Sequence, residues 1–115
     1  MDVESCVAVD NLHDLEKALL ASDRVIALVY ATWCPFCRKV LPVFEKLARK
    51  GKRCLLLVAD DNERAADVYD IDIFPTLILF EKGRIVKRLD GRPGVGLSEK
   101  QIADFIKSCP PAEPG

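Results

Sequence analysis

Two of the five cysteines, Cys34 and Cys37, are separated by only two residues. A C-x-x-C pair supports two kinds of chemistry, reversible dithiol–disulfide exchange and metal binding. A zinc site needs four ligands, whereas this chain has no second C-x-x-C pair and a single histidine, His13, far away in the sequence. We therefore interpret the pair as redox-active, and we expect neither a metal nor a cofactor.

The residues around the pair predict how it is positioned. Residues 24–31 form a continuous, β-branched-rich apolar run, which is typical of a strand covered on both faces. Pro35 is favoured in the first turn of a helix. Cys34 is therefore expected at the carboxyl end of a strand and the beginning of a helix, where unpaired N–H groups and the helix dipole favour a thiolate. Arg38 and Lys39 add positive charge nearby.

The two sulfurs are expected to have different roles. At a helix beginning, the pKa of a cysteine in such a pair can fall from about 8.5, the value of an ordinary thiol, to between roughly 3.5 and 7.5. The thiolate is the species that attacks a disulfide. Cys37 lies one helical turn further on, beside the apolar residues Val40 and Phe44, so it should be more buried. We predict that Cys34 is the attacking nucleophile and that Cys37 is the resolving cysteine.

The remaining apolar patterns predict the elements that hold this pair. Strands are expected at residues 6–9, 24–31, 54–59, 76–80 and 85–89, and helices at residues 12–19, 35–50, 60–69 and 98–106. The order βαβαβαββα predicts an α/β fold with a central mixed sheet flanked by helices on both faces. We expect one domain over residues 1–109, followed by a flexible, proline-rich tail over residues 110–115.

Composition excludes several classes of protein. Lys and Arg together number 17 and Asp and Glu 18, so the chain lacks the basic field of a nucleic-acid binder. No apolar stretch reaches the roughly 18 residues of a membrane span. Residues 1–6 contain no basic segment typical of a secretory signal, and an odd cysteine count fits poorly with a secreted disulfide scaffold. We expect a cytoplasmic monomer with no nucleic-acid or membrane partner.

Several motifs, in this order along the chain, resemble those of the thioredoxin family. They are the stretch 31–37 around the cysteine pair, Pro42, Phe74-Pro75-Thr76, Gly83 and Asp90-Gly91. The resemblance covers about residues 6–109. It implies a thioredoxin fold and a thiol–disulfide oxidoreductase that reduces or exchanges disulfides in client proteins. It also implies that an NADPH-dependent, flavin-containing thioredoxin reductase returns the oxidised pair to the dithiol.

The same resemblance implies a client-binding groove beside the cysteines. It implies a cis peptide bond before Pro75, packed against the pair. The backbone of Phe74 would pair with an extended segment of the client. The residues that would contact the client are Trp33, Pro35, Phe36, Ile73, Phe74, Pro75 and Gly91.

Two alternatives stay open because the sequence departs from the family pattern. Typical thioredoxins have Gly-Pro between the cysteines, whereas Pro35-Phe36 stands here and resembles glutaredoxins. We expect a less reducing pair, since the intervening residues influence the stability of the thiolate. One alternative is therefore a glutaredoxin-like, glutathione-dependent oxidoreductase, although residues 1–23 precede the catalytic strand and Asp90-Gly91 replaces a double glycine. The other is a non-catalytic adaptor.

A second departure concerns the proton of Cys37. Most thioredoxins bury an aspartate six residues before the first cysteine, where this chain has Leu28, and Leu56 replaces its lysine partner. Cys37 then loses its general base, so water or a client group must accept the proton. Of the other cysteines, Cys6 and Cys54 lie in apolar runs and are expected to be core thiols, while Cys109 is a candidate for an exposed thiol.

Overall fold

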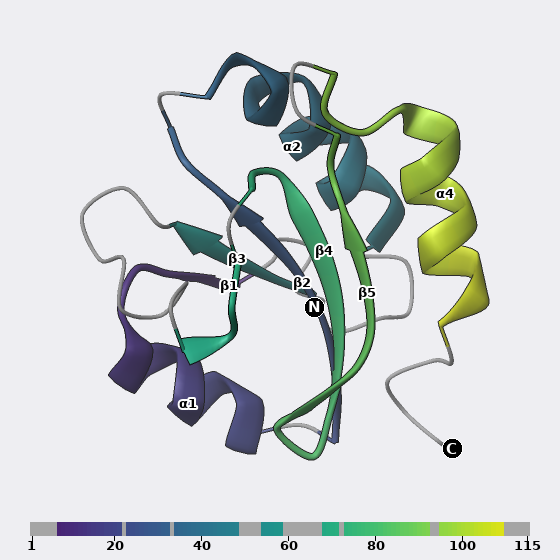
Figure 1. The fold of residues 1–115 in the computed structure, drawn as a ribbon. Helices are drawn as coiled ribbons and strands as arrows, with labels where there is room; N and C mark the ends of the chain where they lie inside the picture. The colour runs from purple at the N-terminus through teal and green to yellow at the C-terminus, as the bar shows by residue number, and fades with distance from the viewer. Residues whose placement is uncertain are drawn as a thin grey trace.

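The computed structural model describes residues 7–21, 23–32, 34–48, 54–58, 68–71, 73–92 and 95–109. In these residues five strands form one mixed sheet with the order β1-β3-β2-β4-β5. The strands are β1 (Val7–Val9), β2 (Arg24–Tyr30), β3 (Cys54–Val58), β4 (Thr76–Glu81) and β5 (Arg84–Asp90). The helices are α1 (Leu12–Leu20), α2 (Pro35–Ala48) and α4 (Glu99–Ser108). In Figure 1, α1 lies on one side of the sheet, and α2 and α4 lie on the other.

The central strand β2 is buried on both faces, as its apolar sequence predicts. It pairs in parallel with β3 and antiparallel with β4. Because side chains alternate along a strand, one set packs towards α1 and the other towards α2 and α4. The first set is Val25, Ala27 and Val29, with Leu15 and Leu19 of α1. The second is Ile26 and Leu28, with Val40 and Phe44 of α2 and Ile102 of α4. The expected α/β architecture is confirmed.

The helix beginnings follow local signals in the sequence. The side chain of Asn11 accepts a hydrogen bond from the backbone N–H of Asp14 at 2.8 Å and caps α1. Ser98 and Gln101 form a capping box at the beginning of α4, with hydrogen bonds of 3.1 and 2.9 Å. Most of the helix expected at residues 60–69, the last residues of the helix expected at 35–50 and the tail lie outside the described residues. Within the described ranges, no helix is long and apolar enough to cross a membrane.

Strands β4 and β5 form a hairpin, with a two-residue turn between the paired Glu81 and Arg84. Lys82 and Gly83 both have positive φ, 53° and 79°. This is the combination that a type I′ turn requires, and it matches the twist of the strands. The register shifts between Leu79 and Phe80 on β4, and beyond this irregularity the pairs are Ile78 with Arg88 and Thr76 with Asp90. Arg88 and Asp90 therefore lie on the same face of β5.

The environment of Tyr69 predicts that the stability of the fold falls at high pH. Its ring packs edge-on against Phe80, with the ring centroids 5.4 Å apart. Burial, and then the nearby charge of Glu16, raise the pKa of Tyr69 above its usual 10.0. The folded state thus holds the phenol proton more tightly than the unfolded state. The resulting stabilisation is complete below the unfolded pKa, and it is lost as the pH rises through the folded value.

We expect Tyr69→Phe to reduce this loss of stability, because the variant keeps the packed ring and removes the titrating hydroxyl. Urea unfolding at pH 8 and at pH 10.5 measures the effect, because these two values lie below and above the ordinary tyrosine pKa of about 10. Wild-type protein should lose more stability than the variant between the two values. Equal losses would contradict the assignment.

Candidate active site

Cys34 lies between the end of β2 and the first residue of α2. Its backbone N–H donates to the carbonyl of Ala31 at 3.1 Å. Its carbonyl accepts from the N–H groups of Cys37 and Arg38 at 3.1 and 3.3 Å, so it begins the hydrogen-bonding of the helix. Pro35 follows as the first helical residue, where a missing N–H costs nothing. The predicted position at a strand end and a helix beginning is confirmed.

The two cysteines lie close together in a small apolar cluster. Both are thiols, and Cys37 is the more buried, with 1% of its surface exposed against 5% for Cys34. Ala31 completes the buried part of the cluster, and Tyr30, Phe36 and Phe74 pack around it. The Nε of Arg38 donates to the carbonyl of Thr32 at 3.4 Å, which keeps this guanidinium near the same helix end.

A loop before β4 brings backbone groups to the Cys34 sulfur. The Cys34 Sγ donates to the Phe74 carbonyl, with the two atoms 3.9 Å apart. The peptide bond between Phe74 and Pro75 is cis, as the family resemblance implied. The loop is held at its end by a hydrogen bond from the Gly91 N–H to the Pro75 carbonyl at 2.9 Å. The pair, the loop and Gly91 thus form one continuous site.

The other predicted contact residues are only partly joined to this site. Phe36 is half-buried and packs on Gly96, where an added Cβ would lie 2.8 Å from the Phe36 Cβ. Pro35 is exposed and Ile73 is half-buried. Trp33 lies outside the described residues. Gly96 and Tyr30 were not predicted as site residues, because neither belongs to a sequence motif that would place it beside the cysteines.

Two leucines occupy the positions where the family resemblance implied a buried charge pair. Leu28 and Leu56 are directly opposite each other on β2 and β3, with 0% and 6% exposure. Both belong to the core beneath α2. A surface pocket of about 360 Å³ reaches the neighbourhood of Cys37, and its lining comprises Tyr30, Ala31, Thr32, Cys37, Arg38 and Leu41. It offers water an approach to the resolving cysteine that does not depend on an acidic side chain.

Two expectations about the remaining cysteines are wrong. Cys54, expected to be a core thiol, is disulfide-bonded. Cys6, the other cysteine expected to be a core thiol, lies outside the described residues. Cys109, a candidate for an exposed thiol, is 3% exposed, and its Sγ donates to the Phe105 carbonyl at 3.2 Å. It caps the end of α4, so the helix covers the sulfur. In the part of the chain that is described, no cluster of three or more metal-binding side chains occurs.

Gly91 offers a direct test of how closely the loop is packed. A Cβ at this position would lie 2.7 Å from the Pro75 carbonyl oxygen, a backbone atom that can move only with the loop. We expect Gly91→Ala to destabilise the protein by about 1–3 kcal/mol, as overpacked sites do, and to weaken client binding. Urea unfolding and the KM for a protein disulfide measure the two effects.

The matched control is Gly83→Asn in the β4–β5 turn. That position has open space around it, and asparagine tolerates its positive φ of 79°. The control should leave client binding unchanged. If Gly91→Ala had the same stability and the same KM as the wild type, the loop would be less tightly packed than this contact implies.

Comparison with known proteins identifies the class to which this fold and site belong. The Thioredoxin family model matches residues 6–108. A mutant thioredoxin from Halobacterium salinarum NRC-1 superimposes with a TM-score of 0.79 at 28% identity, covering 98% of this chain and 96% of that one. The chain therefore belongs to the thioredoxin family, and its domain is of the thiol–disulfide oxidoreductase class.

Three curated relatives differ in how much of their length this chain covers. Thioredoxin of Chlamydia pneumoniae is 34% identical over 87 residues, which are 74% of this chain and 80% of that protein. Protein disulfide-isomerase A5 of Bos taurus is 26% identical over 94% of this chain. Bifunctional thioredoxin reductase/thioredoxin of Mycobacterium leprae (strain TN) is 32% identical over 87% of it. The chain spans about a fifth of the length of these last two, 21% and 22%.

Proposed function

We propose that Cys34 and Cys37 reduce or exchange disulfides in client proteins, with Cys34 as the nucleophile and Cys37 as the resolving thiol. One observation carries this proposal. Cys34 lies at the beginning of α2 with its sulfur 3.9 Å from the Phe74 carbonyl, and the more buried Cys37 lies close by one turn along the same helix. The pair thus combines one sulfur beside the backbone of the loop with a second, more buried sulfur close to it.

The reaction proceeds by two successive exchanges. The Cys34 thiolate attacks one sulfur of the client disulfide, forming a mixed disulfide and releasing the other client sulfur as a thiolate. Cys37 then loses its proton and attacks the Cys34 sulfur, which forms the 34–37 disulfide and releases the second client thiolate. Two electrons pass from the cysteine pair to the client. The helix N-terminus stabilises the attacking thiolate in the first step.

The client binds along the loop of residues 73–75. An extended client segment pairs with the backbone of Phe74, because main-chain hydrogen bonds hold a strand of any sequence. The proposed contact residues around this loop are Pro35, Phe36, Ile73, Pro75 and Gly91, and the sequence adds Trp33 as a further candidate. The packing of Phe36 and Phe74 around the cysteine pair supports this arrangement.

A reductant must return the 34–37 disulfide to the dithiol, and we propose an NADPH-dependent thioredoxin reductase. Support comes from the Mycobacterium leprae relative, whose name joins a thioredoxin reductase to a thioredoxin. The chain acts as a cytoplasmic monomer whose partners are its clients and this reductant. Its odd cysteine count supports that location. Subcellular fractionation with immunoblotting against a cytoplasmic and a secreted marker protein tests the location, and recovery only with the secreted marker would contradict it.

An insulin-reduction assay tests the enzyme proposal. With dithiothreitol as the final reductant, the protein should accelerate insulin reduction well above the uncatalysed rate. A non-catalytic adaptor would leave that rate unchanged. Replacing dithiothreitol by NADPH and thioredoxin reductase, or by glutathione and glutathione reductase, identifies the electron donor. Turnover with glutathione alone would contradict the proposed partner.

Leu28→Asp should speed the resolution step, because a carboxylate there would supply Cys37 with a general base. We expect resolution of the mixed disulfide to become of the order of 10²-fold faster, the lower end of general-base effects. Stopped-flow measurement of client release gives the rate. Leu28→Asn is the matched control, since it adds similar polarity to the same buried position without a base. Equal rates in wild type, Leu28→Asp and Leu28→Asn would remove the argument that the base is missing.

A further inference from the structure

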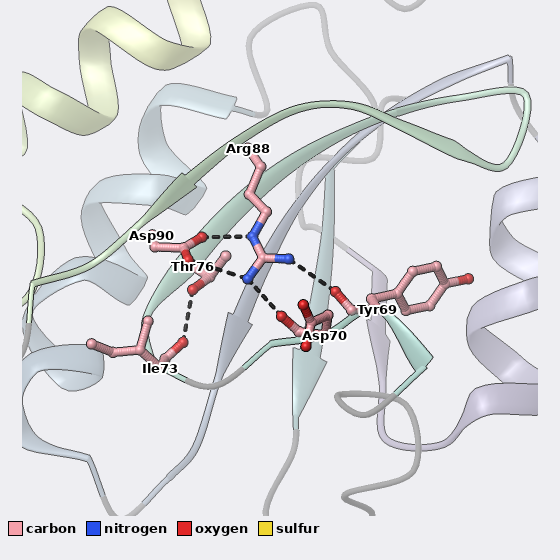
Figure 2. A network of polar contacts seen from close by, with 6 residues as sticks. All are labelled: Tyr69, Asp70, Ile73, Thr76, Arg88 and Asp90. Carbon is pink, nitrogen blue, oxygen red and sulfur yellow. Dashed lines mark hydrogen bonds and ion pairs between the residues drawn. The ribbon is translucent and has the colours of Figure 1, made fainter.

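Arg88 links strand β5 to the segment that leads into the client-binding loop (Figure 2). Its Nη1 donates to the Tyr69 carbonyl at 2.9 Å, and its Nη2 donates to the Asp70 carbonyl at 2.8 Å. Its Nε and Nη2 also donate to the two carboxylate oxygens of Asp90, at 2.6 and 3.2 Å. The planar guanidinium is thus held by Asp90 while its outer N–H groups bind two successive backbone carbonyls.

The two carbonyls need such a partner. Val68 is helical, and Asp70 has a left-handed φ of 56°, so Tyr69 and Asp70 lie where a helical turn ends. Carbonyls at a helix end have no intrahelical partner. Arg88 supplies donors from a different strand, and it thereby fixes where the chain leaves the turn towards the buried Ile71.

The far end of the loop is attached to the same strand end. Thr76 is opposite Asp90 in the ladder, and its hydroxyl donates to the Ile73 carbonyl at 2.7 Å. Gly91, the residue after Asp90, donates to the Pro75 carbonyl at 2.9 Å. Arg88 thus holds residues 69 and 70 before the loop, and Gly91 holds Pro75 at its end. Figure 2 shows Arg88 bound to Tyr69, Asp70 and Asp90, with Thr76 next to Asp90.

We propose that Arg88 is a positioning residue for client binding: with Asp90, it sets the place of the loop that presents the Phe74 backbone beside Cys34. This inference rests on the proposed function, in which that backbone pairs with the client. The Arg88 and Asp90 side chains are 25% and 44% exposed, and a surface ion pair of this kind contributes little to stability by itself. The network therefore acts mainly on the position of the loop and contributes little to the free energy of unfolding.

Arg88→Ala tests this role through two disulfide substrates of different size. Insulin needs the loop backbone for binding, whereas the small aromatic disulfide 5,5′-dithiobis(2-nitrobenzoate) has no peptide backbone to pair with it. We expect the KM for insulin to rise roughly tenfold, because a displaced loop loses much of its alignment with the substrate. The kcat should stay within about twofold, and the rate with the small disulfide should match wild type. A purely structural defect would lower both reactions together.

Two further variants complete the experiment. Arg84→Ala, on the same strand and opposite Glu81, is the matched control and should behave as wild type. Arg88→Lys should recover part of the insulin affinity, because lysine donates to a carbonyl but cannot bind Asp90 and both carbonyls at once. If Arg88→Ala does not fold, Asp90→Asn takes its place, with a smaller rise in the insulin KM expected.

An unchanged insulin KM in Arg88→Ala, or in Asp90→Asn where the first variant is unfolded, would overturn the inference. So would an equal loss with both substrates. Inactive wild-type protein would overturn the proposed function and this inference with it. An active wild type with unaffected variants would overturn the inference alone.

Discussion

Cys34→Ser is expected to reduce insulin reduction to the background rate given by dithiothreitol. The loss should be on the order of 10³-fold or more, as when another covalent catalyst loses its nucleophile. A serine hydroxyl at the beginning of α2 does not attack a disulfide at neutral pH, and Cys37, with 1% exposure, cannot reach a client in its place. The measurement is the initial rate of insulin precipitation at fixed protein and dithiothreitol concentrations.

Cys109→Ser is the matched control for this result. Cys109 is also a buried thiol at the end of a helix, but it belongs to the core around α4 and not to the cluster with Cys34. Serine can still donate to the Phe105 carbonyl, so this variant should keep full activity. A Cys34→Ser protein that retained wild-type activity would show that another sulfur attacks the client.

Cys37→Ser is expected to accumulate the mixed disulfide between Cys34 and the client. The first exchange needs only Cys34, whereas release needs a second sulfur held next to it. Without Cys37, release depends on thiol from solution, and it should slow by about a hundredfold or more because an intramolecular step becomes bimolecular. Non-reducing electrophoresis followed by mass spectrometry detects the adduct and identifies the bonded cysteine.

The double variant Cys34→Ser/Cys37→Ser provides the control, and it should form no adduct. Rapid release from Cys37→Ser, at the wild-type rate and without added thiol, would contradict the resolving role. An adduct on Cys109 in place of Cys34 would contradict the assignment of the nucleophile.

Much of the fold could be predicted because its signals are local. A strand that is covered on both faces must be apolar at every position, and residues 24–31 show that pattern directly. Asn11 and Ser98 cap their helices with side chains that bind backbone only three residues away, so neither depends on the rest of the fold. The turn at Lys82-Gly83 is local in the same way. The position of the cysteine pair could be predicted from the strand at residues 24–31 and the helix that begins at Pro35, which are neighbours in the sequence.

The features that could not be predicted depend on contacts between distant segments. The disulfide of Cys54 depends on which segments the fold brings together, and the apolar run around Cys54 indicated a core thiol instead. The burial of Cys109 depends on how α4 packs against the sheet. The Arg88 network joins β5 to residues 69 and 70, and its sole trace in the sequence is the spacing of Arg88 and Asp90, which places both on one face of a strand.

The most direct test of the central claim is the rate at which each thiol of the reduced protein reacts with limiting iodoacetamide at neutral pH. The claim is that one sulfur, at the beginning of α2, is activated for attack. Peptide mass spectrometry after short labelling should find Cys34 modified at least about tenfold faster than Cys37 or Cys109, since reactive cysteines are partly accessible sulfurs held as thiolates. Equal labelling of the three cysteines, or faster labelling of Cys37, would contradict it.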